Sequence, residues 1–110
     1  MSNKTNNIWR NGIMGVVVGD ALGMPVQFLT REDVNDSPVT GMEGYGTYNM
    51  PEGTWSDDSS MTLCLAKSIG EVGYYHTHDI MARFDDWCRN GAYTPGGKKF
   101  GIGNTCAHAI

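Results

Sequence analysis

Apolar residues repeat at helical spacing in three segments of the chain. In the first, between Ile8 and Leu22, they are Trp9, Ile13, Val16 and Val17. In the second they occupy positions i, i+3, i+4, i+7, i+8 and i+11, namely Met61, Cys64, Leu65, Ser68, Ile69 and Val72. The third puts on one face Ile80, Met81, Phe84, Trp87 and Cys88. We therefore predict an all-α fold, with the first two stripes packed together because they are the two long ones.

Helix-ending and helix-starting residues set the limits of these segments. Pro25 ends the first helix, Ser56–Ser60 begins the second, and the third runs from near Thr77 or Asp79 to Gly91. Asn104 or Thr105 could cap a short fourth helix. Residues 33–56, rich in Gly, Pro, Asn and Ser, indicate a long irregular loop. We expect one compact domain over residues 1–110, without a repeat or linker.

The first helix carries a stripe of glycines beside its apolar residues, formed by Gly12, Gly15, Gly19 and Gly23. Such a stripe fits either tight packing of another helix or the close approach of a ligand. Asp20 lies on or beside the apolar face, so its carboxylate needs a partner. It either anchors the long loop through hydrogen bonds or belongs to a functional site.

Composition narrows the class of protein. The 110 residues are 40% apolar and 18% charged, as in a small globular domain. The formal charge of −4 leaves no broad basic surface for nucleic acid. The longest apolar stretch, residues 13–28, is interrupted too often to span a membrane, and the polar start resembles no signal peptide, so we expect a cytoplasmic protein. Three cysteines without a CxxC pair indicate reduced thiols.

The residues with the strongest potential for metal binding or catalysis lie at the start of the second predicted helix. Ser56, Asp57 and Asp58 offer one hydroxyl and two carboxylates in consecutive positions. Carboxylates there can simply cap the helix and favour the positive end of its dipole. The same hard oxygen donors are also those that Mg²⁺ or Mn²⁺ prefers. His76 and His78 do not share a helical face, which favours a solvated linker, and Asp85 and Asp86 indicate a solvated face of the third helix.

Four segments in order and register resemble the amino-terminal part of the ADP-ribosylglycohydrolase family. They are residues 19–28 (GDALGMPVQF), 53–63 (GTWSDDSSMTL), 87–91 (WCRNG) and 100–105 (FGIGNT). The resemblance implies an all-α enzyme whose site holds two divalent ions and which cleaves the bond between ADP-ribose and a modified side chain or related acceptor. It also implies that Ser56, Asp57 and Asp58 are metal ligands and that Asp20, Gly103 and Asn104 lie near the substrate.

The chain departs from the family pattern in ways that bear on catalysis. Gln27 and Gly101 stand where the family often has acidic residues, so we assign no catalytic residue. The family's second acidic cluster lies farther downstream than Ile110. We expect Mg²⁺ or Mn²⁺ to bind the isolated chain weakly or not at all, and we expect no hydrolysis by it.

Three hypotheses for function follow. In the first, the chain is an ADP-ribosylglycohydrolase whose remaining ligands come from a second chain or from dimerisation. In the second, it is a shortened, silent relative that binds a protein, ADP-ribose or a nucleotide. In the third, it is a piece of an ordinary enzyme. In each case apolar helix faces need covering, so we expect a homo-oligomer or a protein partner.

Overall fold

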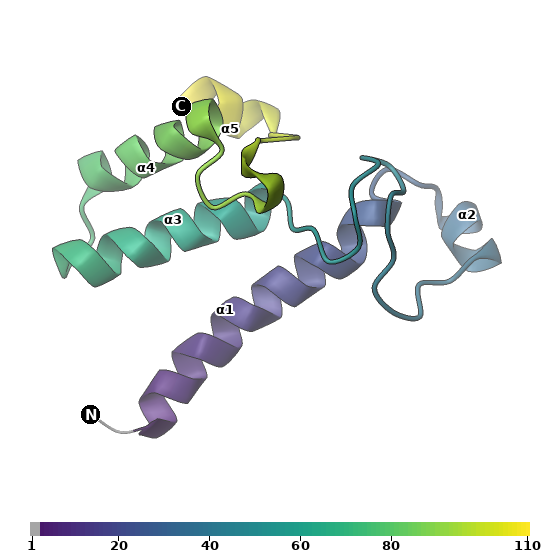
Figure 1. Ribbon diagram of the computed structural model, residues 1–110, viewed down its shortest axis with the longest axis horizontal. Coiled ribbons are helices and arrows are strands. Elements are labelled where there is room, and N and C mark those ends of the chain that lie inside the picture. The colour runs from purple at the N-terminus through teal and green to yellow at the C-terminus, as the bar shows by residue number, and fades with distance from the viewer. Residues whose placement is uncertain (1–2) are drawn as a thin grey trace. The chain divides into compact units, whose positions relative to one another are not determined.

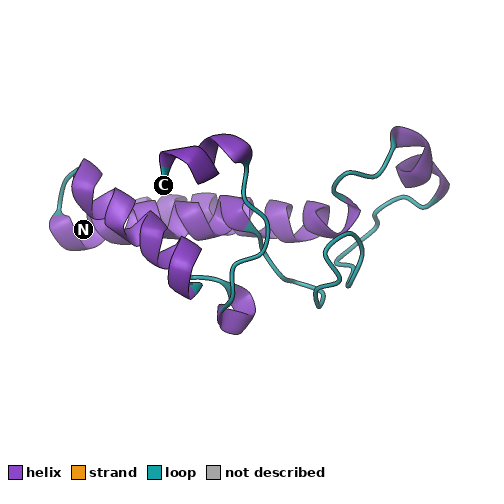
Figure 2. Cartoon of the chain, turned by 90° about the horizontal axis from the view of Figure 1, so that it is seen from above, coloured by secondary structure: helices purple, strands orange, loops and turns teal. Residues whose placement is uncertain are grey.

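The computed structural model describes residues 3–110, with side chains from Ile8 onward, and it is all-α as predicted. In that part of the chain no β-strand occurs, and the longer elements are helices joined by loops (Figure 2). The helices are α1 (Asn3–Gly23), α2 (Arg31–Asp36), α3 (Asp57–Val72), α4 (Thr77–Asn90) and α5 (Asn104–Ala109) (Figure 1). Two short 3₁₀ turns, η1 (Met24–Val26) and η2 (Pro95–Gly97), complete the set.

The chain divides into two compact units. The first ends at Trp55, and the second runs from Ser56 to Ile110. The expected packing of the α3 stripe on the α1 stripe would join the two units, and it stays a prediction. The single domain expected over residues 1–110 also stays a prediction. None of the described helices combines the length and the apolar character that crossing a membrane requires.

In the first unit, the loop after α2 folds back on the turn that ends α1. The Thr47 amide donates to the carbonyl of Pro25 at 2.9 Å, and the Thr47 hydroxyl reaches the carbonyl of Gln27. Gly46 has a φ of +37°, and a Cβ there would overlap the Pro25 carbonyl. Only glycine therefore allows this close approach. Ala21, Met24 and Pro25 are the buried residues at the end of α1.

The predicted irregular loop is wrong at its first residues, because α2 covers residues 31–36. A capping box explains this short helix. The Asp33 amide donates to the Thr30 hydroxyl at 3.1 Å, and the Thr30 amide donates to the Asp33 carboxylate at 3.4 Å. The helix buries no residue, so the sequence carries no apolar stripe there that would predict it.

In the second unit, α3 and α4 lie side by side (Figure 1). The face that α3 buries is small and polar, since Ser60, Cys64 and Ser68 recur at every fourth position. From α4, Ile80 and Trp87 are buried. The predicted stripe is therefore correct at Cys64 and Ser68 but wrong at Ile69, which is 42% exposed. Small side chains allow the two helix backbones to approach closely. The spacing of apolar residues does not identify such small, partly polar contact positions.

The ends of α4 and α5 are set by local contacts. His76 is not a solvated linker residue, because its Nδ1 accepts a hydrogen bond from the Asp79 amide at 3.1 Å and so caps α4. Gly91 ends α4 in the left-handed conformation, as predicted. α5 begins at Asn104 with Gly103 as its cap, so the predicted side-chain cap at Asn104 or Thr105 is wrong.

Candidate functional site

The first part of the candidate site is the beginning of α3. Ser56 has extended backbone and is 8% exposed, and its carbonyl accepts from the Ser60 amide at 3.1 Å. Its side chain does not cap the helix. Asp57 is half-buried and Asp58 is exposed in the first turn. The positive end of the helix dipole therefore lies beside two carboxylates and one buried hydroxyl.

This donor set fits part of a divalent-cation shell. A hydroxyl and two carboxylates are hard oxygen ligands of the kind that Mg²⁺ and Mn²⁺ bind. Within the described part of the chain, no three side chains of His, Cys, Asp or Glu gather in a way that could hold a metal ion. By their chemistry, Ser56, Asp57 and Asp58 could supply part of a ligand set, which would need water or further protein donors to be complete.

The second part is the segment from Phe100 to Asn104, which lies in the same unit as α3. Gly101 is exposed with a φ of +69°, a backbone conformation that favours glycine. Gly103 caps α5 in extended conformation, and Asn104 is exposed at the first position of that helix. This segment presents backbone and amide groups, with no carboxylate.

Two residues singled out by the sequence belong to the first unit. Asp20 is half-buried near the end of α1, and Gln27 is exposed just after η1. The structure brings Ser56, Asp57, Asp58, Gly103 and Asn104 into one unit and these two residues into the other. The glycine stripe of α1 is open, because a Cβ on any of its four glycines would meet no atom within 4 Å.

An ionic network joins α3 and α4. The Arg83 guanidinium donates to Asp79 and to Glu71, each at 2.8 Å, and the Ser68 hydroxyl donates to Asp79 at 2.5 Å. Hydrogen bonds from Ser68 and Arg83 lower the pKa of Asp79, and bonds from Arg83 and Lys67 lower that of Glu71. The network keeps both carboxylates ionised and ties the two helices together.

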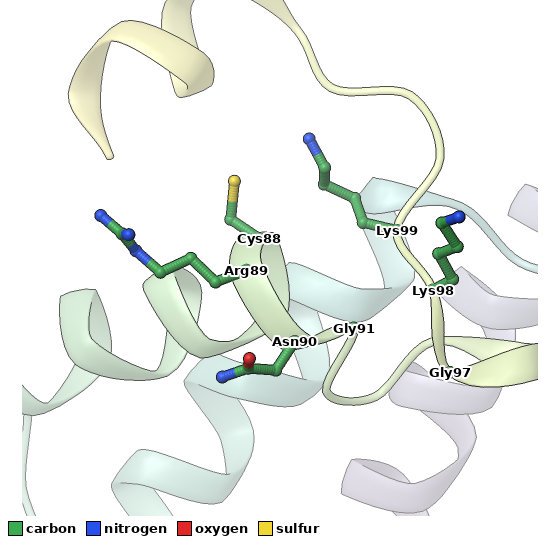
Figure 3. Close-up of a pocket in the computed structure, with 7 residues that line it drawn as sticks. All are labelled: Cys88, Arg89, Asn90, Gly91, Gly97, Lys98 and Lys99. Carbon is green, nitrogen blue, oxygen red and sulfur yellow. The ribbon is translucent and has the colours of Figure 1, made fainter.

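A cationic pocket opens beside the last turn of α4 (Figure 3). It has a volume of about 240 Å³ and is lined by Cys88, Arg89, Asn90, Gly91, Gly97, Lys98 and Lys99. Arg89 is paired with Asp85 at 2.7 Å, whereas neither lysine takes part in an ion pair among the described residues. The pocket was not predicted from the sequence, where its signal is the pair of lysines that follows Pro-Gly-Gly.

Comparison with known proteins decides the family. The family model for ADP-ribosylglycohydrolase matches residues 1–110, the whole chain. The chain belongs to the ADP-ribosylglycohydrolase family.

Relatives in this family are similar over most of the chain. An ADP-ribosylarginine hydrolase, Tri1, from Serratia proteamaculans is 34% identical over 101 residues, and one from Pseudomonas putida is 34% identical over 103. An ADP-ribosyl-[dinitrogen reductase] glycohydrolase from Rhodospirillum rubrum is 30% identical over 99 residues. The matches cover 92%, 92% and 88% of this chain but 27%, 26% and 31% of those relatives.

Proposed function

We propose that this chain supplies the first group of metal ligands of an ADP-ribosylglycohydrolase site and depends on further protein for a complete site. The observation that carries the proposal is the Ser56-Asp57-Asp58 set at the start of α3 in a member of this family. The substrate class is a protein side chain modified with ADP-ribose. Modified arginine is the first to test, because two of the relatives are named ADP-ribosylarginine hydrolases.

A divalent cation bound here would polarise an oxygen of the substrate or activate a water molecule. The chain's own contribution is to hold two carboxylates and a hydroxyl at a rigid helix end. The helix dipole and the free amides of the first turn offset part of the repulsion between the two carboxylates. The ligand set can therefore stay in place with or without the cation.

The chain lacks other parts that hydrolysis needs. Gln27 and Gly101 provide no carboxylate, so neither can act as a general acid or base. The chain also spans less than a third of the length of the relatives described above. We infer that the remaining metal ligands come from residues that are not among these 110.

The surface of α1 supports association with further protein. Ile8, Trp9, Met14, Val16 and Val18 are each at least 40% exposed, and at 100° per residue they fall on several sides of the helix. Large apolar side chains exposed on several sides of a helix favour contact with further protein. Covering α1 with the rest of a family domain would bury these side chains.

A silent binding module is the second candidate function. The glutamine at position 27 and the glycine at position 101 favour it, because both leave the site without a proton-transferring group. Such a module would bind an ADP-ribose-like ligand or a protein without turnover. A cleavage assay on an assembly that contains this chain distinguishes the two functions, because the enzyme would release ADP-ribose and the silent module would not.

Titration of the isolated chain with Mn²⁺ tests the metal site. We expect weak, saturable binding that Asp57→Asn abolishes, because the substitution removes one anionic ligand. Asp86→Asn is the matched control, since Asp86 is an exposed aspartate on α4 that the proposal does not use. Equal loss in both variants, or no binding at millimolar Mn²⁺, would contradict the metal site.

A further inference from the structure

A buried serine connects the start of α3 to the turn that follows α4. The hydroxyl of Ser60 donates to the carbonyl of Tyr93 at 2.9 Å, across 33 residues of sequence. Ser60 is 1% exposed and lies four residues after Ser56, on the same side of the helix. The contact therefore lies one helical turn from the proposed metal ligands.

The loop that Ser60 contacts, Gly91–Gly97, has a tightly defined backbone. The Thr94 amide donates to the Gly91 carbonyl at 3.1 Å, and the Gly97 amide donates to the Thr94 carbonyl at 2.9 Å. Gly91 is buried with a φ of +74°, and a Cβ there would overlap the backbone of Gly97 (Figure 3 labels both glycines). These contacts fix the two ends of the loop against each other.

Tyr93 has an unfavourable conformation that needs support from its surroundings. Its φ of +58° is disfavoured for a residue with a Cβ. Its carbonyl accepts a hydrogen bond from Ser60 of α3. The pKa of Arg83 on α4 is raised chiefly by Asp79 and Glu71, and the Tyr93 side chain adds a smaller contribution. Both helices thus contact one residue of the loop, and Lys98 and Lys99 connect the loop to the Phe100–Asn104 segment.

We propose that Ser60 is a positioning residue, which holds the Gly91–Gly97 loop in a fixed relation to Asp57 and Asp58. This inference rests on the proposed function for its chemical meaning. The hydroxyl donates to the Tyr93 carbonyl and is not one of the proposed metal ligands. Its loss frees the loop and leaves the ligand set of α3 intact.

Amide hydrogen exchange on the full 110-residue chain tests the connection without any metal. In Ser60→Ala we expect exchange of the Thr94 and Gly97 amides to rise by roughly 3- to 10-fold, the effect of one ordinary hydrogen bond. The Gly91 amide, which donates to Trp87 within α4, should exchange unchanged. Ser60→Thr keeps a hydroxyl and should restore slow exchange. Thr94 and Gly97 amides that exchange at the wild-type rate in Ser60→Ala would overturn the inference.

Paramagnetic broadening by Mn²⁺ tests the positioning role. In the wild-type chain we expect Mn²⁺ to broaden the amide signals of Ser59 and Tyr93, and in Ser60→Ala we expect the broadening at Tyr93 to weaken relative to that at Ser59. Equal broadening at Tyr93 in both chains would overturn the positioning role. Absence of broadening at Ser59 in the wild-type chain would contradict the proposed metal site, while the exchange measurement still decides the role of Ser60. If Ser60→Ala fails to fold, Ser60→Cys, with its weaker donor, replaces it in both measurements.

Discussion

Cys64 lies fully buried between α3 and α4, and desolvation raises the pKa of its thiol to about 11. The thiolate is the reactive form, so a thiol with this pKa stays protonated and inert at neutral pH. We predict that iodoacetamide at pH 8 labels Cys64 only after the chain is unfolded, while the half-buried Cys106 reacts faster. Peptide mapping checks this, and fast labelling of Cys64 in the folded chain would contradict its burial.

Thr94 carries a buried hydroxyl that has no hydrogen-bond partner among the described residues. An unpaired buried hydroxyl costs free energy, and valine has nearly the same shape without it. We predict that Thr94→Val leaves the free energy of unfolding unchanged or raises it by up to about 1 kcal/mol. A loss of more than about 1 kcal/mol in chemical denaturation would show that the hydroxyl has a partner after all.

Individual residues differ in how well the sequence predicted them. Ser56, Asp57 and Asp58 were recognisable as the start of a helix, because hydroxyl and carboxylate residues directly before an apolar stripe mark such a start. The hydrogen bonds of Ser60 and His76 could not be predicted in this way, because each depends on a partner that only folding brings close. The Tyr93 carbonyl is 33 residues from Ser60, and no local pattern links the two.

At the scale of elements, the α3–α4 pair depends on carboxylates whose pKa values are lowered on folding. Asp79 and Glu71 bind protons less readily in the folded chain than in the unfolded chain. Their contribution to stability is therefore complete above the unfolded pKa values, near 4, and is lost as the pH falls through the lower folded values.

Arg83→Gln removes the cation that both carboxylates share. We predict that the variant has a lower Tm than the wild-type chain at pH 7 and that this difference shrinks as the pH falls below about 4. Thermal unfolding followed by circular dichroism from pH 7 to pH 3 measures both quantities. A difference in Tm that stays constant with pH would contradict the network.

Two helix-ending glycines allow a matched comparison of backbone effects. Gly73 after α3 and Gly91 after α4 both have left-handed backbone, but a Cβ would meet no atom near Gly73 and would overlap the Gly97 backbone at Gly91. We predict a cost of about 1 kcal/mol for Gly73→Ala and at least about twice that for Gly91→Ala. Equal costs in denaturant unfolding would show that the Gly91–Gly97 loop is not tightly packed.

The sequence predicted α3 and α4 well, because each combines apolar residues at helical spacing with a clear start, and Gly91 marks the end of α4. It missed α2, a six-residue helix that buries nothing and depends on one capping box. It also placed Ile69 in the core, because periodicity identifies apolar faces but not the small residues through which two helices approach.

At the scale of the whole molecule, the apolar surface of α1 predicts association. Trp9 is 70% exposed, and its indole would gain by burial in any assembly. We expect sedimentation velocity to show association that increases with concentration in the micromolar range, and we expect Trp9→Gln to weaken it. A strictly monomeric wild-type chain over that range would contradict association of the isolated chain.

Whether these 110 residues form a complete site can be decided by measuring release of ADP-ribose from an ADP-ribosylated arginine peptide, with Mg²⁺ or Mn²⁺ at millimolar concentration. Because the proposed ligand set is partial and positions 27 and 101 carry no carboxylate, we predict no release by the isolated chain above a blank without protein. Turnover by the isolated chain that Asp57→Asn abolishes and Asp86→Asn leaves intact would contradict it, since the 110 residues would then form a complete active site.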